Sequence, residues 1–339
     1  MTTYPIAIVG ATGLVGTTLL QLLEERRFPT SELFLVASQQ SAGKDIMLAD
    51  KKFRVHDLAT FDFHQTRIAF FCVSNDLAAE YAPKATAAGN IVIDKSYYYR
   101  NHQDVPLIIP EVNLSDLAQY KKMSIIANPN CNTIPIAVGL KPIYDAVGIS
   151  RMNVATYQSV SGTGKDAIAE LNEQTKQLLS GETIKPKVYP QQIAFNVLPQ
   201  IDDFLENGYT REEMKIVWEM QKIYRDKTMV INPTTVRVPV FYGHAAAVHL
   251  ETKEKISAAQ ALSLLSKAPG IKILTGQNAY PTPARDAAGS DFVYVGRVRE
   301  DISHPLGLNL WVVADNLRKG AALNAIQIAE HLIKSHFTV

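Results

Sequence analysis

A cysteine flanked by asparagines is the residue in this sequence best suited to nucleophilic chemistry. Cys131 lies in the segment NPNCNT (128–133), between a predicted strand over 124–127 and apolar helical residues that resume at Ile134. A thiol at the first turn of a helix interacts with the helix dipole, which favours the nucleophilic thiolate. Cys131 is therefore a candidate nucleophile. The other cysteine, Cys72, lies in the apolar run FFCV and is expected in the core.

An arginine and a histidine in the segment RVPVFYGH (237–244) could complete the chemistry of such a thiol. The apolar pattern predicts a strand over 234–241, which places Arg237 in the strand and His244 in the loop after it. Arginine binds carboxylates through two parallel hydrogen bonds, and histidine is the usual general base near neutral pH. The two are candidates for a carboxylate clamp and an acid/base, although each alone is more often a surface hydrogen-bonding residue.

A glycine-rich turn at the start of the chain is typical of a phosphate-binding loop. The segment GATGLVG places Gly10, Gly13 and Gly16 between a predicted strand over 4–10 and a predicted helix over 14–27. Glycines there let the backbone approach a pyrophosphate, whose charge then meets the helix N-terminus. The spacing differs from the common G-x-G-x-x-G, so a tight turn without a ligand remains the alternative.

The end of the second predicted strand bears on cofactor choice. The sequence continues SQQSAGK (38–44) and has no carboxylate until Asp45, whereas an NAD site usually places Asp or Glu there to bind the ribose hydroxyls. Hydroxyls, amides and a lysine can accept a ribose phosphate, which favours NADP. An ordinary polar loop is the alternative.

The elements that position these residues suggest two different halves. Strands are predicted at 4–10, 33–37, 68–73, 91–94 and 124–127, with helical stretches between several of them. Strands that alternate with helices form a parallel sheet, so the first half is predicted to be a doubly wound α/β domain.

The second half changes in character. Longer strands are predicted at 152–160, 234–241 and 245–251, and a long polar helix at 164–179. We expect an α/β protein with a Rossmann-like doubly wound domain over 1–128, completed by a C-terminal helix within 317–339. An α+β domain is expected over 129–316.

Composition agrees with this organisation. At about 150 residues per domain, 339 residues predict two domains. With 34 basic and 33 acidic residues, the net charge of +1 favours neither nucleic acid nor an anionic membrane as partner, which leaves a small molecule. Two cysteines are too few for a disulfide framework, and we find neither a signal peptide nor a membrane-spanning run. We expect a cytoplasmic protein without a metal site.

With these motifs in view, the chain resembles the aspartate-β-semialdehyde dehydrogenases of the wider semialdehyde dehydrogenase family. The matching strings are GATGLVG, VIDKS, IIPEVN, NPNCNT, TYQSVSGTG, REEMK, RVPVFYGHAA and ADNLRKGAALNA. NPNCNT together with the R-x6-H spacing is the specific part. The resemblance implies a homodimer with a dinucleotide-binding domain and a catalytic and dimerisation domain. It further implies NADP-dependent interconversion of aspartate semialdehyde plus phosphate with aspartyl phosphate, in lysine (through diaminopimelate), threonine and methionine biosynthesis.

The resemblance also implies roles for single residues. Cys131 matches the cysteine that forms a thioester with the substrate, His244 the acid/base, and Gln158 the glutamine that orients the substrate near the thiol. Arg237 would bind the substrate carboxylate and Glu212 its amino group.

Two cations and a set of cofactor contacts are implied in the same way. Arg100 and Lys215 match the phosphate-binding pair. The implied cofactor contacts are Gly10, Thr12, Gly13, Leu14, Val15, Ser38, Gln40, Ser41, Ser161, Gly162 and Asn316. Many relatives have an arginine just before the SAGK segment where this chain has Gln40, so use of NAD besides NADP stays open.

Two alternatives compete with this assignment. An acyl-phosphate reductase similar to N-acetyl-glutamyl-phosphate reductase would share the fold and the thiol chemistry, but the strings around Cys131 and Gln158 favour the aspartate type. A non-catalytic dinucleotide-binding relative would be expected to have lost some of the catalytic residues, yet Arg237 and His244 are present as well.

Overall fold

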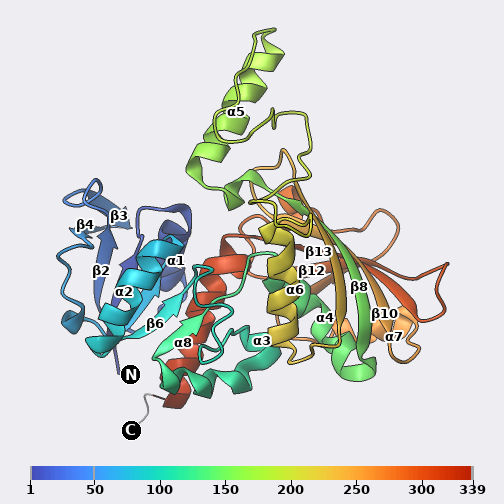
Figure 1. Ribbon diagram of the computed structural model, residues 1–339, viewed down its shortest axis with the longest axis horizontal. Helices are drawn as coiled ribbons and strands as arrows, with labels where there is room; N and C mark the ends of the chain where they lie inside the picture. Colours follow the sequence, from blue (N-terminus) through green and yellow to red (C-terminus); the bar gives the residue numbers. More distant parts are fainter. Residues whose placement is uncertain (1, 49, 337–339) are drawn as a thin grey trace. The chain divides into compact units, whose positions relative to one another are not determined.

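The chain forms two compact units in the computed structural model, which describes residues 2–48 and 50–336 (Figure 1). The first unit contains the described residues up to Asn130 together with those from Ala321 onward, and the second runs Cys131–Gly320. The boundaries between the units, after Asn130 and after Gly320, lie slightly beyond the boundaries that we expected, after residues 128 and 316. Each unit is built around its own sheet.

The first unit contains a seven-stranded sheet in the order β3-β4-β2-β1-β5-β6-β7. Its strands are β1 Tyr4–Val9, β2 Thr30–Ala37, β3 Asp45–Leu48, β4 Lys51–Asp57, β5 Ile68–Phe71, β6 Ile91–Asp94 and β7 Ile125–Ala127. Every pairing is parallel except β3 with β4. The chain adds strands on one side of β1 and then on the other, which is the doubly wound arrangement and confirms the predicted fold class. The β3–β4 hairpin is an addition that the sequence pattern did not reveal.

The helices of this unit are α1 Leu14–Glu25, α2 Asn75–Ala87, α3 Pro110–Asn113 and α8 Leu323–His336, with 3-10 turns at Phe63–Gln65 and Leu114–Lys122. α1 buries leucines at helical spacing in one apolar cluster with α8. An ion pair of 2.8 Å between Arg26 and Glu330 links the two helices. The C-terminal helix therefore packs within the first unit; a π-helical turn over Arg318–Ala322 precedes it.

The second unit contains a six-stranded sheet in the order β11-β12-β13-β10-β8-β9. Its strands are β8 Ile149–Gln158, β9 Val230–Arg237, β10 His244–Thr252, β11 Ile271–Leu274, β12 Val293–Glu300 and β13 Gly307–Ala314. β8 with β9 and β11 with β12 are parallel, and the other pairs are antiparallel. With its helices this sheet forms the α+β architecture that was predicted.

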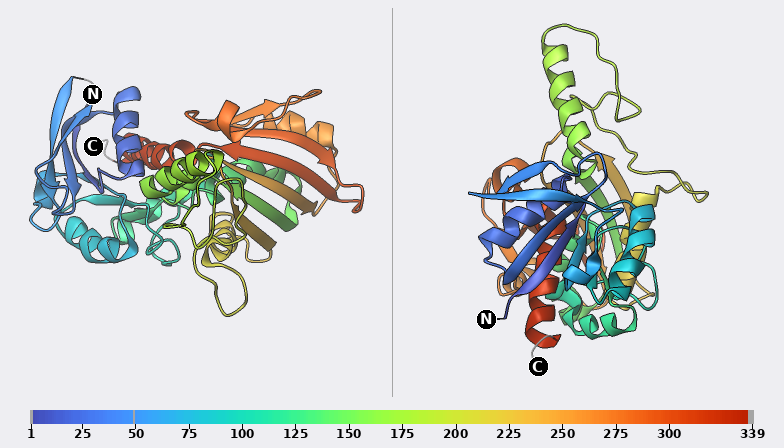
Figure 2. Two further views of the ribbon diagram at one scale, coloured as in Figure 1. Left: turned by 90° about the horizontal axis from the view of Figure 1, so that it is seen from above. Right: turned by 90° about the vertical axis from the view of Figure 1, so that its left-hand side faces the viewer.

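Helices cover one face of this sheet. They are α4 Thr133–Val147, α6 Arg211–Ile223 and α7 Ala258–Leu265, and α4 contacts both other helices as well as β10, β12 and β13. On the opposite face, alternate side chains such as Tyr157 and His249 are exposed. α5 Lys165–Leu179 projects away from the sheet (Figures 1 and 2). None of the described helices has the length and apolar character needed to span a membrane.

Candidate active site

One edge of the six-stranded sheet brings together residues from three strands. Gln158 ends β8 and Arg237 ends β9, and the two are register partners in a parallel pair, so both strands end at the same edge. His244 begins β10, which runs antiparallel to β8 and therefore starts at that edge. Three residues separated by up to 86 positions in the sequence thus become neighbours.

The strand expected over 234–241 is wrong at its C-terminal end. β9 stops at Arg237, since the chain turns away over 238–243, where Pro239 has no N–H for a ladder and Gly243 has a φ of +85°. On its other side Arg237 forms a bridge with Leu198, donating its N–H to the Leu198 carbonyl at 2.8 Å. His244 consequently opens the next strand rather than lying in a loop.

The Cys131 thiol lies beside the His244 imidazole. Sγ is 3.4 Å from Nε2, within hydrogen-bonding distance for sulfur. Cys131 forms no disulfide among the described residues and is half-buried. It precedes α4 by two positions, with Asn132 as the N-cap, so it stands just before the first turn in which we had expected it. A thiol so placed, with an imidazole partner, has the surroundings that favour a reactive thiolate.

His244 is buried, and two contacts of its Nδ1 with Ser159 hold it in place. Nδ1 lies 3.0 Å from the backbone nitrogen of Ser159, which donates to it, and 3.1 Å from the Ser159 hydroxyl. Burial, and secondarily the positive charge of Arg237, lowers the pKa of His244 to about 3. The imidazole is therefore neutral near pH 7.

Arg237 is 5% exposed and only partly satisfied by the protein. Its Nη1 donates to the carbonyl of Ser159 at 2.8 Å, whereas Nε has no hydrogen-bond partner among the described residues. A buried donor without a partner is costly, and a bound carboxylate would satisfy it. A Cβ on Gly162 would lie 2.9 Å from Nη1 and 3.2 Å from the His244 ring, so glycine keeps the space before both groups open.

Glu212 connects the thiol segment to the end of β8. Its Oε1 accepts hydrogen bonds from Asn132 Nδ2 at 3.1 Å and from Gln158 Nε2 at 3.3 Å. Asn132 Nδ2 is also 3.9 Å from the sulfur of Cys131. A carboxylate held by two amides thus orients both Gln158, the predicted substrate-binding glutamine, and Asn132, the residue next to Cys131.

A capping box positions Glu212 on its helix. The Thr210 side chain accepts from the backbone N–H of Glu213, and the Glu213 carboxylate accepts from the N–H of Thr210, which sets the first residue of α6. Glu212 and Lys215, three positions apart, then share one face.

The cation of Lys215 lies between two carboxylates. Its Nζ is 3.1 Å from Glu212 Oε2 and 2.7 Å from Asp202 Oδ2. Arg100, its predicted partner in phosphate binding, belongs to the first unit, where it is buried and donates Nη2–H to the carbonyl of Lys95 at 2.6 Å. Joint phosphate binding by these two residues stays a prediction.

The glycine turn of the first unit fits a closely approaching ligand. Gly10 has a φ of +87°, and a Cβ on Gly16 would lie 2.2 Å from the Gly10 carbonyl oxygen, so helix α1 can pack against the turn only without a side chain there. Gly13, the N-cap of α1, provides no side-chain cap, which leaves the amides of this helix end without a side-chain acceptor. Of the other predicted contacts, Thr12 lies in this turn, and Leu14 and Val15 are the first two residues of α1.

The other predicted cofactor contacts fall in two places. Ser38, Gln40 and Ser41 lie in the turn that follows β2, where the Ser41 N–H donates to the Ser38 carbonyl at 2.8 Å. Ser161 and Asn316 lie in the second unit. Their side chains are hydrogen-bonded to each other, with 3.2 Å between the Ser161 hydroxyl and Asn316 Oδ1.

The sequence analysis missed four residues that the structure places around the thiol network. They are Asn132, Ser159, Asp202 and Gly320; a Cβ on Gly320 would lie 3.1 Å from the Cys131 carbonyl. Asn132 and Ser159 adjoin predicted residues in the same motifs, which was the available signal. Across residues 2–48 and 50–336, no group of three or more His, Cys, Asp or Glu side chains could hold a metal ion.

A doubly wound sheet with a glycine turn, together with a unit that pairs a thiol with an imidazole, is typical of dinucleotide-dependent dehydrogenases that work through a cysteine. Comparison with known families is more specific. The model for "Semialdehyde dehydrogenase, NAD binding domain" matches residues 5–120, and that for "Semialdehyde dehydrogenase, dimerisation domain" matches residues 140–319. The chain belongs to the semialdehyde dehydrogenase family, as its sequence suggested.

Individual relatives identify the branch of the family. An aspartate-semialdehyde dehydrogenase of Legionella pneumophila is 56% identical over 96% of this chain and 95% of its own length. One from Shewanella sp. (strain DB6705) is 54% identical over 98% and 99%. The crystal structure of aspartate semialdehyde dehydrogenase II from Vibrio cholerae, complexed with ASA, has a TM-score of 0.98 at 54% identity, covering 99% of this chain and all of that one. These matches support the aspartate type over the N-acetyl-glutamyl-phosphate reductase alternative.

The low pKa of His244 predicts a pH-dependent stability. The unfolded chain takes up a proton on this residue below about pH 6.5, but the folded protein does so only near pH 3, so its contribution to stability is lost as pH falls through that window. Between wild type and His244→Gln, the difference in free energy of unfolding should change by up to about 1.4 kcal/mol per pH unit.

Urea unfolding at fixed protein concentration, between about pH 4.5 and 7.5, measures this difference. His64→Gln is the matched control, since that histidine side chain is 77% exposed. A difference between wild type and His244→Gln that stays constant across the range would contradict a buried neutral imidazole.

Proposed function

We propose that this chain catalyses the reversible conversion of L-aspartate 4-semialdehyde and phosphate to L-4-aspartyl phosphate, with NADP and through a thioester on Cys131. The reaction serves amino-acid biosynthesis toward lysine, threonine and methionine. The observation that carries the proposal is the 3.4 Å contact of the Cys131 thiol with His244, beside a buried arginine whose Nε has no hydrogen-bond partner among the described residues. The Vibrio cholerae relative, crystallised with ASA, supports the substrate.

In the oxidative direction, the Cys131 thiolate attacks the aldehyde carbon, and a carbon–sulfur bond forms. His244 serves as the acid/base beside the sulfur, and Gln158 orients the substrate. The bound dinucleotide supplies the hydride acceptor. Loss of hydride from the substrate carbon leaves a thioester on Cys131. Phosphate then attacks this thioester, the carbon–sulfur bond breaks, and the thiolate is regenerated as acyl phosphate leaves.

Charge complementarity explains how the substrate would be held. The Arg237 guanidinium binds the α-carboxylate through its unsatisfied Nε, while the buried carboxylate of Glu212 faces the α-amino group. Lys215 and Arg100 bind phosphate and stabilise the negative charge of the acyl phosphate. Two carboxylates already hold Lys215, so phosphate binding there means sharing this cation with Asp202 and Glu212.

The central test is removal of the thiol. Cys131→Ala should lower phosphate-dependent NADPH formation from aspartate semialdehyde by at least about 10⁴-fold, because no other group can form the thioester. Cys72→Ala is the matched control. That thiol packs against the core of the first unit, burial raises its pKa to about 11, and the variant should stay active. Substantial activity in Cys131→Ala would remove it as nucleophile.

The preference for NADP is the second part of the proposal. β2 ends without a carboxylate of its own. Asp45, the next one in the sequence, opens β3 and is paired with Lys52 at 2.8 Å, and Asp57, which ends β4, is the register partner of Ala37. Positive charge is also close to the turn, because Nη2 of Arg54 lies 3.7 Å from the point where a Cβ on Gly43 would stand. Arg54 therefore supplies a cation to the turn in which Gln40 replaces the arginine of many relatives.

Cofactor choice can be shifted at this turn. Gln40→Arg should raise the NADP:NAD ratio of kcat/KM by about tenfold or more, and Arg54→Ala should lower it by a similar factor, since each changes one charge available to the ribose phosphate. Steady-state kinetics with both cofactors, aspartate semialdehyde and phosphate measure the ratio. Equal use of NAD and NADP by all three proteins would refute a phosphate site here.

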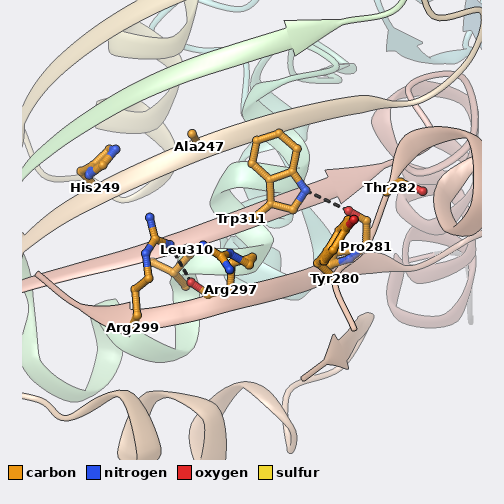
Figure 3. A pocket seen from close by; sticks show the side chains of 9 residues that line it. All are labelled: Ala247, His249, Tyr280, Pro281, Thr282, Arg297, Arg299, Leu310 and Trp311. Atoms are coloured by element: carbon orange, nitrogen blue, oxygen red, sulfur yellow. Dashed lines mark hydrogen bonds between the residues drawn. The ribbon is translucent and has the colours of Figure 1, made fainter. Parts of the chain in front are cut away.

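A homodimer is the third part of the proposal, and the open face of the six-stranded sheet is its contact surface. Residues 140–319 match a dimerisation domain, which includes this sheet. The face carries exposed Tyr157 and a cavity of about 370 Å³ beside Trp311, whose indole N–H donates to the Pro281 carbonyl at 2.9 Å (Figure 3). Such a hollow, partly aromatic sheet face suits burial against a second copy.

A charge at the centre of this face should weaken the dimer. Ala247 lies on β10 between its register partners Ala155 and Trp311, and Ala247→Glu would place a larger, charged side chain from each subunit in a symmetric interface. We expect the dimer Kd to rise by at least about 100-fold, as measured by analytical ultracentrifugation. Lys227→Glu, at an exposed residue in the turn between α6 and β9, is the charge control. A dimer unaffected by Ala247→Glu would place the interface elsewhere.

The cellular location follows from the chemistry. Cys72 and Cys131 form no disulfide in the described part of the chain, and the proposed reaction requires Cys131 reduced. Reducing conditions in the cytoplasm maintain such thiols, so we place the enzyme there.

A further inference from the structure

The carboxylate of Asp202 contacts Lys215 but takes no part in the steps of the proposed reaction. Its Oδ2 is 2.7 Å from Lys215 Nζ, closer than Glu212 Oε2 at 3.1 Å. Because the Lys215 side chain is only 13% exposed, water screens these two contacts incompletely. An anion that approaches Lys215 therefore meets two negative charges beside the positive one.

A short hairpin fixes the position of Asp202 beside α6. Phe204 and Thr210 form an isolated β-bridge, and the N–H of Arg211 donates to the Asp203 carbonyl at 2.8 Å. Asp202 itself has a φ of +69°, a left-handed conformation that aspartate and asparagine adopt more readily than most residues with a side chain. The backbone, and not only the ion pair, thus holds this carboxylate at the helix.

Asp202 is ionised near pH 7. Burial acts to raise the pKa of its carboxyl, but the hydrogen bond from Lys215 and the charge of that lysine lower the pKa below its ordinary value. Its Oδ1 accepts from the backbone N–H of Asp203 at 2.9 Å and lies 3.8 Å from Arg211 Nε. Asp202 therefore keeps its negative charge beside Lys215 under the conditions of the proposed reaction.

The Lys215 cation is connected to the segment that carries the thiol. Glu212 contacts Lys215 through Oε2 and accepts from Asn132 Nδ2 through Oε1 at 3.1 Å. Asn132 is the neighbour of Cys131 in the chain, where phosphate attacks the thioester in the proposed reaction. The charge balance at Lys215 is thus set next to the reacting segment.

We propose that Asp202 is a positioning residue that weakens phosphate binding, because its carboxylate competes with the incoming anion for the cation of Lys215. The ammonium group attracts a phosphate ion, and the carboxylate already bound to that group repels it. The moderate affinity that results lets phosphate leave as well as bind, as a reversible reaction requires. This proposal rests on the proposed function, in which Lys215 binds phosphate.

Asp202→Asn removes the charge with little change of shape. Asparagine tolerates the positive φ, and Glu212 still holds Lys215. We expect KM for phosphate to fall by about fivefold, while KM for aspartate semialdehyde changes by less than about twofold. Steady-state NADPH formation at constant ionic strength, with each substrate varied in turn, measures both constants.

Asp202→Gly is the second variant, since it removes the carboxylate entirely and also tolerates the positive φ. It should lower KM for phosphate as well, whereas a carboxylate that only held Lys215 in place would raise this KM when lost. Asp203→Asn is the matched control. That side chain is 84% exposed and lies 4.0 Å from Arg211, so its loss should leave KM for phosphate unchanged.

Isothermal titration calorimetry with inorganic phosphate, in the presence of NADP, measures the binding without turnover. We expect Kd for phosphate to fall by about fivefold in Asp202→Asn, as KM does. If neither Kd nor KM for phosphate falls in the two folded Asp202 variants, the inference is wrong while an active wild type leaves the proposed function standing. Loss of the proposed function would show as an inactive wild type, and the calorimetry would still decide the role of Asp202.

Discussion

The contact between the Cys131 sulfur and the His244 ring imposes the main constraint on the second unit. It joins a residue just before α4 to the first residue of β10, so the helix must pack on the sheet with its N-terminus at one particular edge. α4 does so through apolar side chains that contact β10, β12 and β13. The core packing of this unit is thus what sets a distance of 3.4 Å between two side chains 113 positions apart.

Burial gives each polar group at this edge its properties. His244 stays neutral because water is excluded and Arg237 adds positive charge nearby. The cost of burying these polar groups is reduced because they form hydrogen bonds with one another. The backbone N–H of Ser159 donates to the imidazole, and Arg237 donates to the carbonyl of Ser159. Glu212 accepts from two side-chain amides. Among the described residues the Nε of Arg237 stays without a hydrogen-bond partner, which is why we propose that it binds an anionic group of the substrate.

Much of the fold could be predicted, since apolar periodicity is local information. The strand over 91–94 was predicted to the residue, and β1, β2 and β8 to within a few positions. The strand carrying Arg237 was extended too far because its apolar run continues through Pro239, and only the turn around Gly243 shows that the chain reverses there. The β3–β4 hairpin was missed because polar, mostly exposed strands have little hydrophobic pattern.

The sequence by itself determined the two-unit organisation, the glycine turn, and the choice of Cys131 and His244, because each depends on residue type and local spacing. The tertiary structure decided how these groups are held. That Ser159 donates to Nδ1, that Glu212 bridges Asn132 and Gln158, and that Asp202 shares Lys215 are contacts between segments far apart in the chain. Such contacts arise only when the packed core brings strand ends to one edge, so no local pattern can encode them.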